Sequence, residues 1–281
     1  MRHFIVLACV LVVAWTIFPR LSGYVTLKKE VSAHYERGLS HRDSGEYKQA
    51  VREYSEAIRL DPGYAKAYYE RGEVFAKLGK HLKAIEDFSQ AVAIDPKYAN
   101  AYFAQGIAYY NLDNYSEALV SYNQAIDIDP KNGGAYNNRG AIYRIFGDYS
   151  EAIADFSQTI AIDPKDAAAH YNRALVYVDL GDHPKAIADY SQAIKLNPYH
   201  ANAYINRGMI HYNLGNTNRA IDDFSQAIRI DPTNPLPYTH RARAYADQQN
   251  YEQATQDTQS ACQFGDCEVL NILQGGNLTD R

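Results

Sequence analysis

The side chains that most often carry catalysis or bind metal ions are scattered through this sequence of 281 residues. Its nine histidines form no His-Glu-x-x-His motif and its three cysteines form no Cys-x-x-Cys motif, so the usual spacings of a zinc site are missing. Residues Gly72 to Lys80 do not match the phosphate-binding loop. We therefore expect a protein that is not an enzyme and that uses no cofactor and no metal. No serine stands in a Gly-x-Ser-x-Gly turn, so the recurring serines are expected at solvated helix positions: Ser55, Ser89, Ser157, Ser191 and Ser225.

Arginine and an acidic residue recur sixteen residues apart, which points to ion pairing. In one stretch both charges are missing together, because Gln105 and Ser121 take the two places. A row of arginines that bound an anion would not lose its acids at the same point, so we expect pairs that join two helices. The predicted structural pairs are Arg37 with Glu53, Arg71 with Asp87, Arg139 with Asp155, Arg173 with Asp189, Arg207 with Asp223 and Arg241 with Asp257.

A repeated element must position these pairs, because a proline recurs every 34 residues from Pro62 to Pro232. The eighth residue of each 34-residue unit is glycine or alanine, as in Gly72 and Ala174. Glycine inside a helix costs about 0.5–1 kcal/mol relative to alanine, so its recurrence indicates that a neighbouring helix approaches closely. A breaker such as Leu78-Gly79 divides each unit into two helical stretches. Each unit is therefore predicted to be a helical hairpin.

One stretch shows the whole pattern. Residues 133 to 164 carry Ala-Tyr-x-x-x-Gly-x-x-Tyr, then Gly-x-Tyr-x-x-Ala-Ile-x-x-Phe, and end in Asp-Pro. This pattern resembles the tetratricopeptide repeat (TPR), although Asp113 and Thr258 depart from it. The resemblance implies an all-α fold, an α-solenoid with a right-handed superhelix of seven hairpins and a short C-terminal cap. The expected divisions are repeats at 31–64, 65–98, 99–132, 133–166, 167–200, 201–234 and 235–264, and a cap and tail at 265–281.

The N-terminal segment is an export signal. Met1-Arg2-His3 precedes fifteen uncharged, mostly apolar residues, Phe4 to Phe18. This run is shorter than the roughly 20 residues that span a bilayer comfortably, so residues 1–23 fit both a cleaved signal peptide and an N-terminal membrane anchor. A linker is expected at 24–30. We expect the protein to be exported, and to be periplasmic or membrane-anchored facing the periplasm or exterior.

The last two cysteines, Cys262 and Cys267, lie five residues apart. In an exported chain they could close a small disulfide loop over the C-terminal end, and two free thiols are equally consistent with the sequence.

The resemblance also implies a binding surface. In the family, the first helices of the hairpins form a concave wall that binds the ligand, and positions 2, 5, 9 and 12 of each repeat line it. Aromatic rings beside polar groups suit an extended peptide or an amphipathic helix. Transferred by position, the groove residues are Tyr69, Phe103, Tyr110, Asn137, Arg144, Tyr171, Asn202 and Tyr212.

The net charge of −5 argues against a nucleic-acid partner. We expect a protein or peptide partner and a non-catalytic scaffold or adaptor of the cell envelope. Two alternatives stay open. One is a module that binds cell-wall glycan or peptidoglycan, and the other is an accessory subunit of a secretion or outer-membrane assembly complex.

Overall fold

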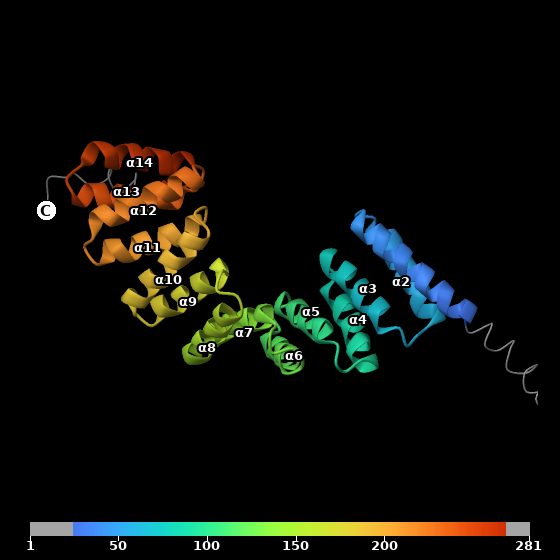
Figure 1. The fold of residues 1–281 in the computed structure, drawn as a ribbon. Helices are drawn as coiled ribbons and strands as arrows, with labels where there is room; N and C mark the ends of the chain where they lie inside the picture. The colour runs from blue at the N-terminus through green and yellow to red at the C-terminus, as the bar shows by residue number, and fades with distance from the viewer. Residues whose placement is uncertain (1–24, 268–281) are drawn as a thin grey trace, which may run out of the picture. The chain divides into compact units, whose positions relative to one another are not determined.

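The computed structural model describes residues 25–267, and over this range the regular structure is helical throughout (Figure 1). The first helix spans residues 25–43, so residues 25–30 continue a helix instead of forming the expected linker. No proline or glycine lies there to end the helix. The others are α2 (Tyr47–Leu60), α3 (Ala65–Lys77), α4 (His81–Ile94), α5 (Ala99–Tyr110), α6 (Tyr115–Ile128), α7 (Gly133–Phe146), α8 (Tyr149–Ile162), α9 (Ala167–Asp179), α10 (His183–Leu196), α11 (Ala201–Asn213), α12 (Thr217–Ile230), α13 (Pro235–Asp247) and α14 (Tyr251–Gln263).

Consecutive helices form seven hairpins in the described range, numbered here from hairpin 1 (residues 25–43 with α2) to hairpin 7 (α13 with α14). Each hairpin turn has one residue in the left-handed region, as at Gly79 with φ 70°. The N–H of Lys80 donates to the carbonyl of Phe75 at 2.8 Å, which satisfies the end of α3 and reverses the chain. Asp113 and Gln249 adopt the same left-handed conformation without being glycine, with φ of 57° and 62°.

The Asp-Pro pairs form the turn between one hairpin and the next. Asp95 ends α4 in an extended conformation, with φ −124° and ψ 93°, because the following Pro96 disfavours the helical region. Its carboxylate then accepts a hydrogen bond from the backbone N–H of Lys97 at 3.0 Å. The recurring proline thus marks where each second helix stops.

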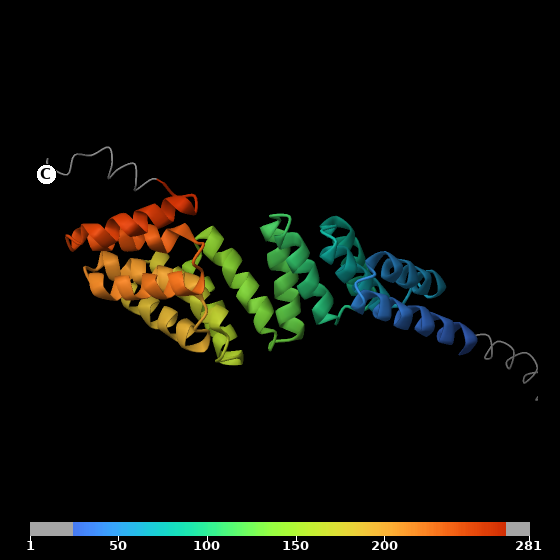
Figure 2. The ribbon, with the colours of Figure 1, turned by 90° about the horizontal axis from the view of Figure 1, so that it is seen from above.

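The chain divides into two compact units, residues 1–135 and 136–281, and the division falls inside α7. In the first unit, α3 pairs with α4 and α5 with α6, while α2 packs on α3 and α4 on α5. In the second unit, α9 pairs with α10, α11 with α12 and α13 with α14, and the contacts of α8 with α9, α10 with α11 and α12 with α13 join successive hairpins. Figures 1 and 2 show these neighbouring helices side by side within each unit. Hairpins therefore stack on hairpins.

Small residues under aromatic rings form the core of each hairpin. Phe88 of α4 is fully buried and lies directly over Gly72 of α3, where an added Cβ would be 2.7 Å from the ring atom Cε1. Ala84 and Ala91 flank Phe88 on the same helix and are also fully buried. The close approach indicated by the recurring glycine is thus made by the second helix of the same hairpin.

The all-α fold class and the hairpin arrangement of an α-solenoid agree with the sequence analysis. The expected signal or anchor at 1–23 lies outside the described residues, as does the tail from residue 268 onward. Among residues 25–267, no helix is both long and apolar enough to cross a bilayer.

Replacing Gly72 by alanine is expected to destabilise the fold by about 1–3 kcal/mol, because the methyl group would collide with the buried Phe88 ring. An unstrained helical Gly→Ala change has the opposite effect and stabilises by about 0.5–1 kcal/mol. Urea unfolding of the full chain measures the difference. Ala174→Gly at the same position of hairpin 5 is the matched control, since that hairpin already accommodates a methyl group. A more stable Gly72→Ala variant would contradict the packing described here.

Candidate functional site

The arginines and acids that recur along the sequence are joined across each hairpin. Arg71 Nε donates to Asp87 Oδ2 at 2.8 Å and Arg71 Nη2 donates to Asp87 Oδ1 at 2.7 Å. Asp87 is almost fully buried, so this two-point contact is the compensation for placing a carboxylate in the core. The pairs with the same geometry are Arg139 with Asp155, Arg173 with Asp189, Arg207 with Asp223 and Arg241 with Asp257.

Hairpin 1 has a weaker version of this pair. Arg37 reaches Glu53 with Nε alone, at 2.9 Å, and its side chain is 49% exposed. His34 Nδ1 contacts the same carboxylate oxygen at 2.8 Å. The predicted pair of Arg37 and Glu53 is therefore formed, but at a more open site.

The recurring serines are not solvated, contrary to expectation. Arg71 Nη1 donates to Ser55 Oγ at 2.9 Å, and Ser55 Oγ donates in turn to the carbonyl of Val51 at 2.7 Å. The serine belongs to the second helix of the preceding hairpin, so its hydroxyl faces the next hairpin and not water. Arg71 thus joins three helices of two hairpins. The same contact links Arg173 to Ser157, Arg207 to Ser191 and Arg241 to Ser225.

Hairpin 3 keeps this connection without charge. Gln105 Nε2 donates to Ser89 Oγ at 2.9 Å, as the arginine does elsewhere. Gln105 Oε1 accepts from Ser121 Oγ at 3.2 Å, in the place of the carboxylate contact. The paired substitution therefore preserves every partner and explains why both charges are missing from the same hairpin. We call the Ser–Arg–Asp chains and this neutral equivalent the polar ladder.

Tyrosines at the fourth repeat position cover the arginines. The Arg71 guanidinium lies 5.6 Å from the ring centre of Tyr68, and Arg139 lies 5.4 Å from that of Tyr136. Hydrogen bonding to Asp155 raises the pKa of Arg139, so the arginine keeps its charge. In hairpin 5, His170 takes the tyrosine position and its Nδ1 contacts Asp189 at 3.2 Å.

The predicted groove residues lie on the first helices of the hairpins, a surface that we call the first-helix wall. In the first unit, Tyr69 is half-buried between Phe88 and Tyr98, with ring centres 5.9 and 5.0 Å away. Phe103 packs 6.0 Å from Tyr122, and Tyr110 packs 5.5 Å from Tyr115. These rings therefore contribute to packing as well as to the surface.

The groove residues of the second unit mostly tie one first helix to the next. Tyr171 accepts from Asn206 Nδ2 at 3.1 Å, Asn137 accepts from Asn172 Nδ2 at 3.0 Å, and Arg144 contacts Asp179 at 2.6 Å. Tyr212 donates to Asp247 Oδ2 at 2.5 Å, and this bond raises the pKa of Tyr212 to about 12. Asn202 is exposed on α11. The wall thus has fixed side chains, and the partners Asp179, Asn206 and Asp247 were not predicted.

A pocket of about 230 Å³ opens in the first unit, lined by Arg42, Asp43, Tyr69, Glu70, Glu73 and Lys77. Arg42 Nε donates to Asp43 Oδ1 at 2.9 Å, and Arg42 Nη1 donates to Glu70. Burial raises the pKa of Glu73, and the nearby charge of Glu70 raises it further. Of these six residues, only Tyr69 was among the predicted groove residues. One feature of the sequence could have indicated this pocket: Glu73 is the only acid among the seven residues at its repeat position.

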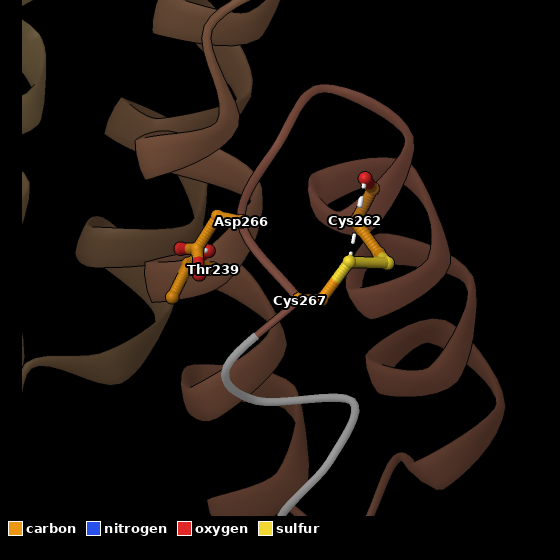
Figure 3. The surroundings of a disulfide bond; sticks show 4 residues. All are labelled: Thr239, Cys262, Asp266 and Cys267. Carbon is orange, nitrogen blue, oxygen red and sulfur yellow. Dashed lines mark hydrogen bonds between the residues drawn. A yellow bond between two sulfur atoms is a disulfide. The ribbon is translucent and has the colours of Figure 1, made fainter.

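Cys262 and Cys267 are joined by a disulfide that closes the chain just after α14 (Figure 3). The loop between them places Asp266 against α13, where its Oδ2 accepts from Thr239 Oγ1 at 2.6 Å (Figure 3). Phe264 packs 6.0 Å from the ring of Tyr238. In this terminal hairpin the closed loop therefore covers the side of α13.

No group of three or more histidine, cysteine, aspartate or glutamate side chains within residues 25–267 is arranged to hold a metal ion. The described residues form packing contacts, hydrogen bonds and the mixed-charge pocket of the first unit.

Sequence profiles of known families match this repeated architecture. Profiles described as tetratricopeptide repeat match residues 35–99, 171–235, 99–132 and 121–154, and one described as TPR repeat matches residues 140–181. Together they run without a gap from residue 35 to residue 235. The chain belongs to the tetratricopeptide repeat family. A search of curated proteins finds no match to this TPR chain.

Solved TPR structures share the fold. A tetratricopeptide repeat protein from Parabacteroides merdae ATCC 43184 is 19% identical, with a TM-score of 0.65 over 87% of this chain and 97% of that one. MamA is 25% identical, with a TM-score of 0.56 over 59% of this chain and 96% of its own. YrrB, described as a TPR protein with an unusual peptide-binding site, is 22% identical, with a TM-score of 0.58 over 68% of this chain and 98% of its own.

Replacing Arg71 by glutamine is expected to lower the free energy of unfolding by about 3–5 kcal/mol, because it leaves the buried Asp87 without its charged partner. Adding Asp87→Ser recreates the neutral contacts of hairpin 3 and should recover most of this loss. Urea unfolding of the single and double variants measures both effects.

The matched control is Arg59→Gln, which breaks the exposed pair with Glu56 on α2 and should change stability by less than about 1 kcal/mol. If the Arg71→Gln and Asp87→Ser effects simply add, the polar ladder does not work as a unit.

Replacing both Cys262 and Cys267 by serine is expected to destabilise hairpin 7 by about 2 kcal/mol, the loop-closure contribution of a short disulfide loop. Hydrogen–deuterium exchange of the full chain should become faster in α13 and α14 and stay unchanged in α3 to α6, since each hairpin contacts only its neighbours. Reduction of the unaltered chain serves as the control and should reproduce the change. Equal acceleration in both units would contradict a local role for the loop.

Proposed function

We propose that this TPR protein is a non-catalytic interaction scaffold of the cell envelope that binds a peptide or helix of a protein partner on its first-helix wall. The observation that carries the proposal is the composition of that wall. Aromatic rings such as Tyr69 of α3 and Phe103 of α5 are held half-buried by their neighbours, and exposed amides such as Asn100 of α5 and Asn202 of α11 also lie on first helices. Ordered aromatic anchors beside amide groups suit the apolar side chains and backbone of a peptide.

The hydrogen bonds between consecutive first helices support the same proposal. Because the Tyr171 and Tyr212 hydroxyls are each held by the next first helix, a partner would meet a surface whose shape is already set. Less side-chain entropy is then lost on binding. The peptide-binding site named for YrrB, a protein of similar fold, fits this type of partner.

The alternative of a glycan-binding module is less well supported. Sugar recognition by stacking needs an open aromatic face. The rings of Tyr69 and Tyr171 instead pack against Tyr98 and His200, with ring centres 5.0 and 4.6 Å away.

Export from the cytoplasm is part of the proposal, since the disulfide between Cys262 and Cys267 is of a kind that persists in oxidising compartments. The apolar run Phe4 to Phe18 supplies the export signal, and we propose that the folded repeats face the periplasm or exterior. Anchoring through this run is compatible with the same placement.

Photo-crosslinking tests the binding surface. A photoreactive residue is placed at Asn202 on α11 or at Asn100 on α5, both exposed on the first-helix wall, and as a matched control at the exposed Asp222 on α12. After illumination in intact cells, the same partner should be captured from Asn202 or Asn100 at least about tenfold more strongly than from Asp222. Capture mainly from Asp222, or from no position, would contradict binding on the first-helix wall.

A further inference from the structure

The pocket in the first unit differs in charge from the rest of the first-helix wall. Glu73 occupies the ninth repeat position. Its carboxylate can attract a cation, whereas the other hairpins have an apolar or basic side chain at this position. It shares the pocket lining with Glu70 and Tyr69. The residues at the same position of the other six hairpins are Leu39, Ile107, Ala141, Leu175, Met209 and Arg243.

The pocket has an acid that the described residues leave unpaired. Its lining contains three negative side chains, Asp43, Glu70 and Glu73, and two positive ones, Arg42 and Lys77. Arg42 is already shared between Asp43 and Glu70. Glu73 makes no hydrogen bond or ion pair with any residue from 25 to 267, although the charge of Lys77 acts on it. The charged group of the pocket that lacks an ion-pair partner is therefore an acid.

Outside the pocket lining, a second polar group near these charges lacks a hydrogen-bond partner within the described residues. Tyr54 of α2 is fully buried, and its hydroxyl forms no hydrogen bond within the described part of the chain. Burial raises the pKa of Tyr54, and the charge of Glu70 raises it further while that of Arg42 lowers it. The charges of Glu70 and Arg42 therefore act on this hydroxyl although Tyr54 does not line the pocket, and the hydroxyl of Tyr190, at the same repeat position of hairpin 5, likewise forms no hydrogen bond within the described residues.

We propose that this pocket is a subsite for a basic side chain, lysine or arginine, of the bound partner. The inference rests on the proposed function, because it gives one anchor position of the peptide on the first-helix wall. The cationic head would lie between Glu73 and Glu70, and its apolar stem would contact the part of Tyr69 that lines the pocket. A bare metal ion is a poorer guest, since the described acids are not arranged as a set of metal ligands.

The ionisation of Glu73 favours binding of a basic side chain. Its raised pKa means that the ionised carboxylate is disfavoured in the free protein, with Glu70 opposing it and Lys77 and Arg42 favouring it. A bound cation would stabilise the ionised form. Binding of the basic side chain should therefore weaken as the pH falls through the raised pKa of Glu73.

A positional-scanning library of capped peptides, screened against the immobilised full chain at pH 7, tests the proposal. One position should show a preference for lysine and arginine over their neutral counterparts, and Glu73→Gln should reduce that preference about tenfold or more. Glu86→Gln removes the same charge from an exposed site on α4 of the same hairpin and should leave the preference unchanged.

Thermal melts separate this effect from damage to the fold. Glu73→Gln should melt at or above the temperature of the unaltered chain at pH 7, because a raised folded-state pKa makes the ionised acid destabilising there. This advantage should shrink as the pH falls and vanish below about pH 3, where the acid is protonated in both states. Glu73→Leu, with the residue of hairpins 1 and 5, provides a second neutral variant and should also lose the preference.

The outcomes distinguish the two proposals. Peptide binding without a basic preference, or with one that survives in Glu73→Gln and Glu73→Leu, would overturn the subsite and leave the first-helix wall as the binding surface. The absence of binding by any peptide in the library would overturn peptide recognition on the wall itself.

Discussion

The buried contact between an arginine and an aspartate is the interaction on which this array depends. Taken alone, a carboxylate as buried as Asp87 would be strongly destabilising. The two-point contact from Arg71 and the further bond to Ser55 convert it into a junction of three helices. Because the junction recurs within each unit, it fixes how the two helices of a hairpin lie against each other and against the preceding hairpin of the same unit. This junction thereby also sets the positions of the helices that form the first-helix wall and the pocket.

The small residues of the first helices make this junction geometrically accessible. Gly72 lets the ring of Phe88 approach the backbone of α3, which brings the second helix close enough for Asp87 to reach Arg71. Packing and polar contacts are therefore coupled within a hairpin. Hairpin 3 shows that shape matters more than charge, since Gln105 and Ser121 keep the same partners in neutral form.

The sequence was sufficient to predict the hairpins, because their 34-residue period sets the helix ends, the turns and the arginine–acid pairs together. It was insufficient for contacts that cross from one hairpin to the next. The serine at Ser55 was assigned to solvent because its own helix does not reveal which face the following hairpin covers. The bond from Tyr212 to Asp247 and the lining of the pocket depend on the same stacking offset, which no single repeat encodes. The predicted groove residues lie on the first helices of the hairpins and stay a prediction as a binding surface, and their hydrogen-bond partners were not predicted.

The polar ladder has a direction. Four arginines donate to a serine that precedes them in the chain, as Arg241 does to Ser225, and Arg37 in hairpin 1 makes the more exposed contact with Glu53. A polypeptide that emerges from the ribosome or a translocation channel with its amino end first therefore presents each of these serine acceptors before its arginine, while the aspartate of the pair follows sixteen residues later. A new first helix can dock on the preceding hairpin of its unit as it appears, and its own second helix then completes the ion pair, so assembly within each unit is suited to vectorial growth from the amino end.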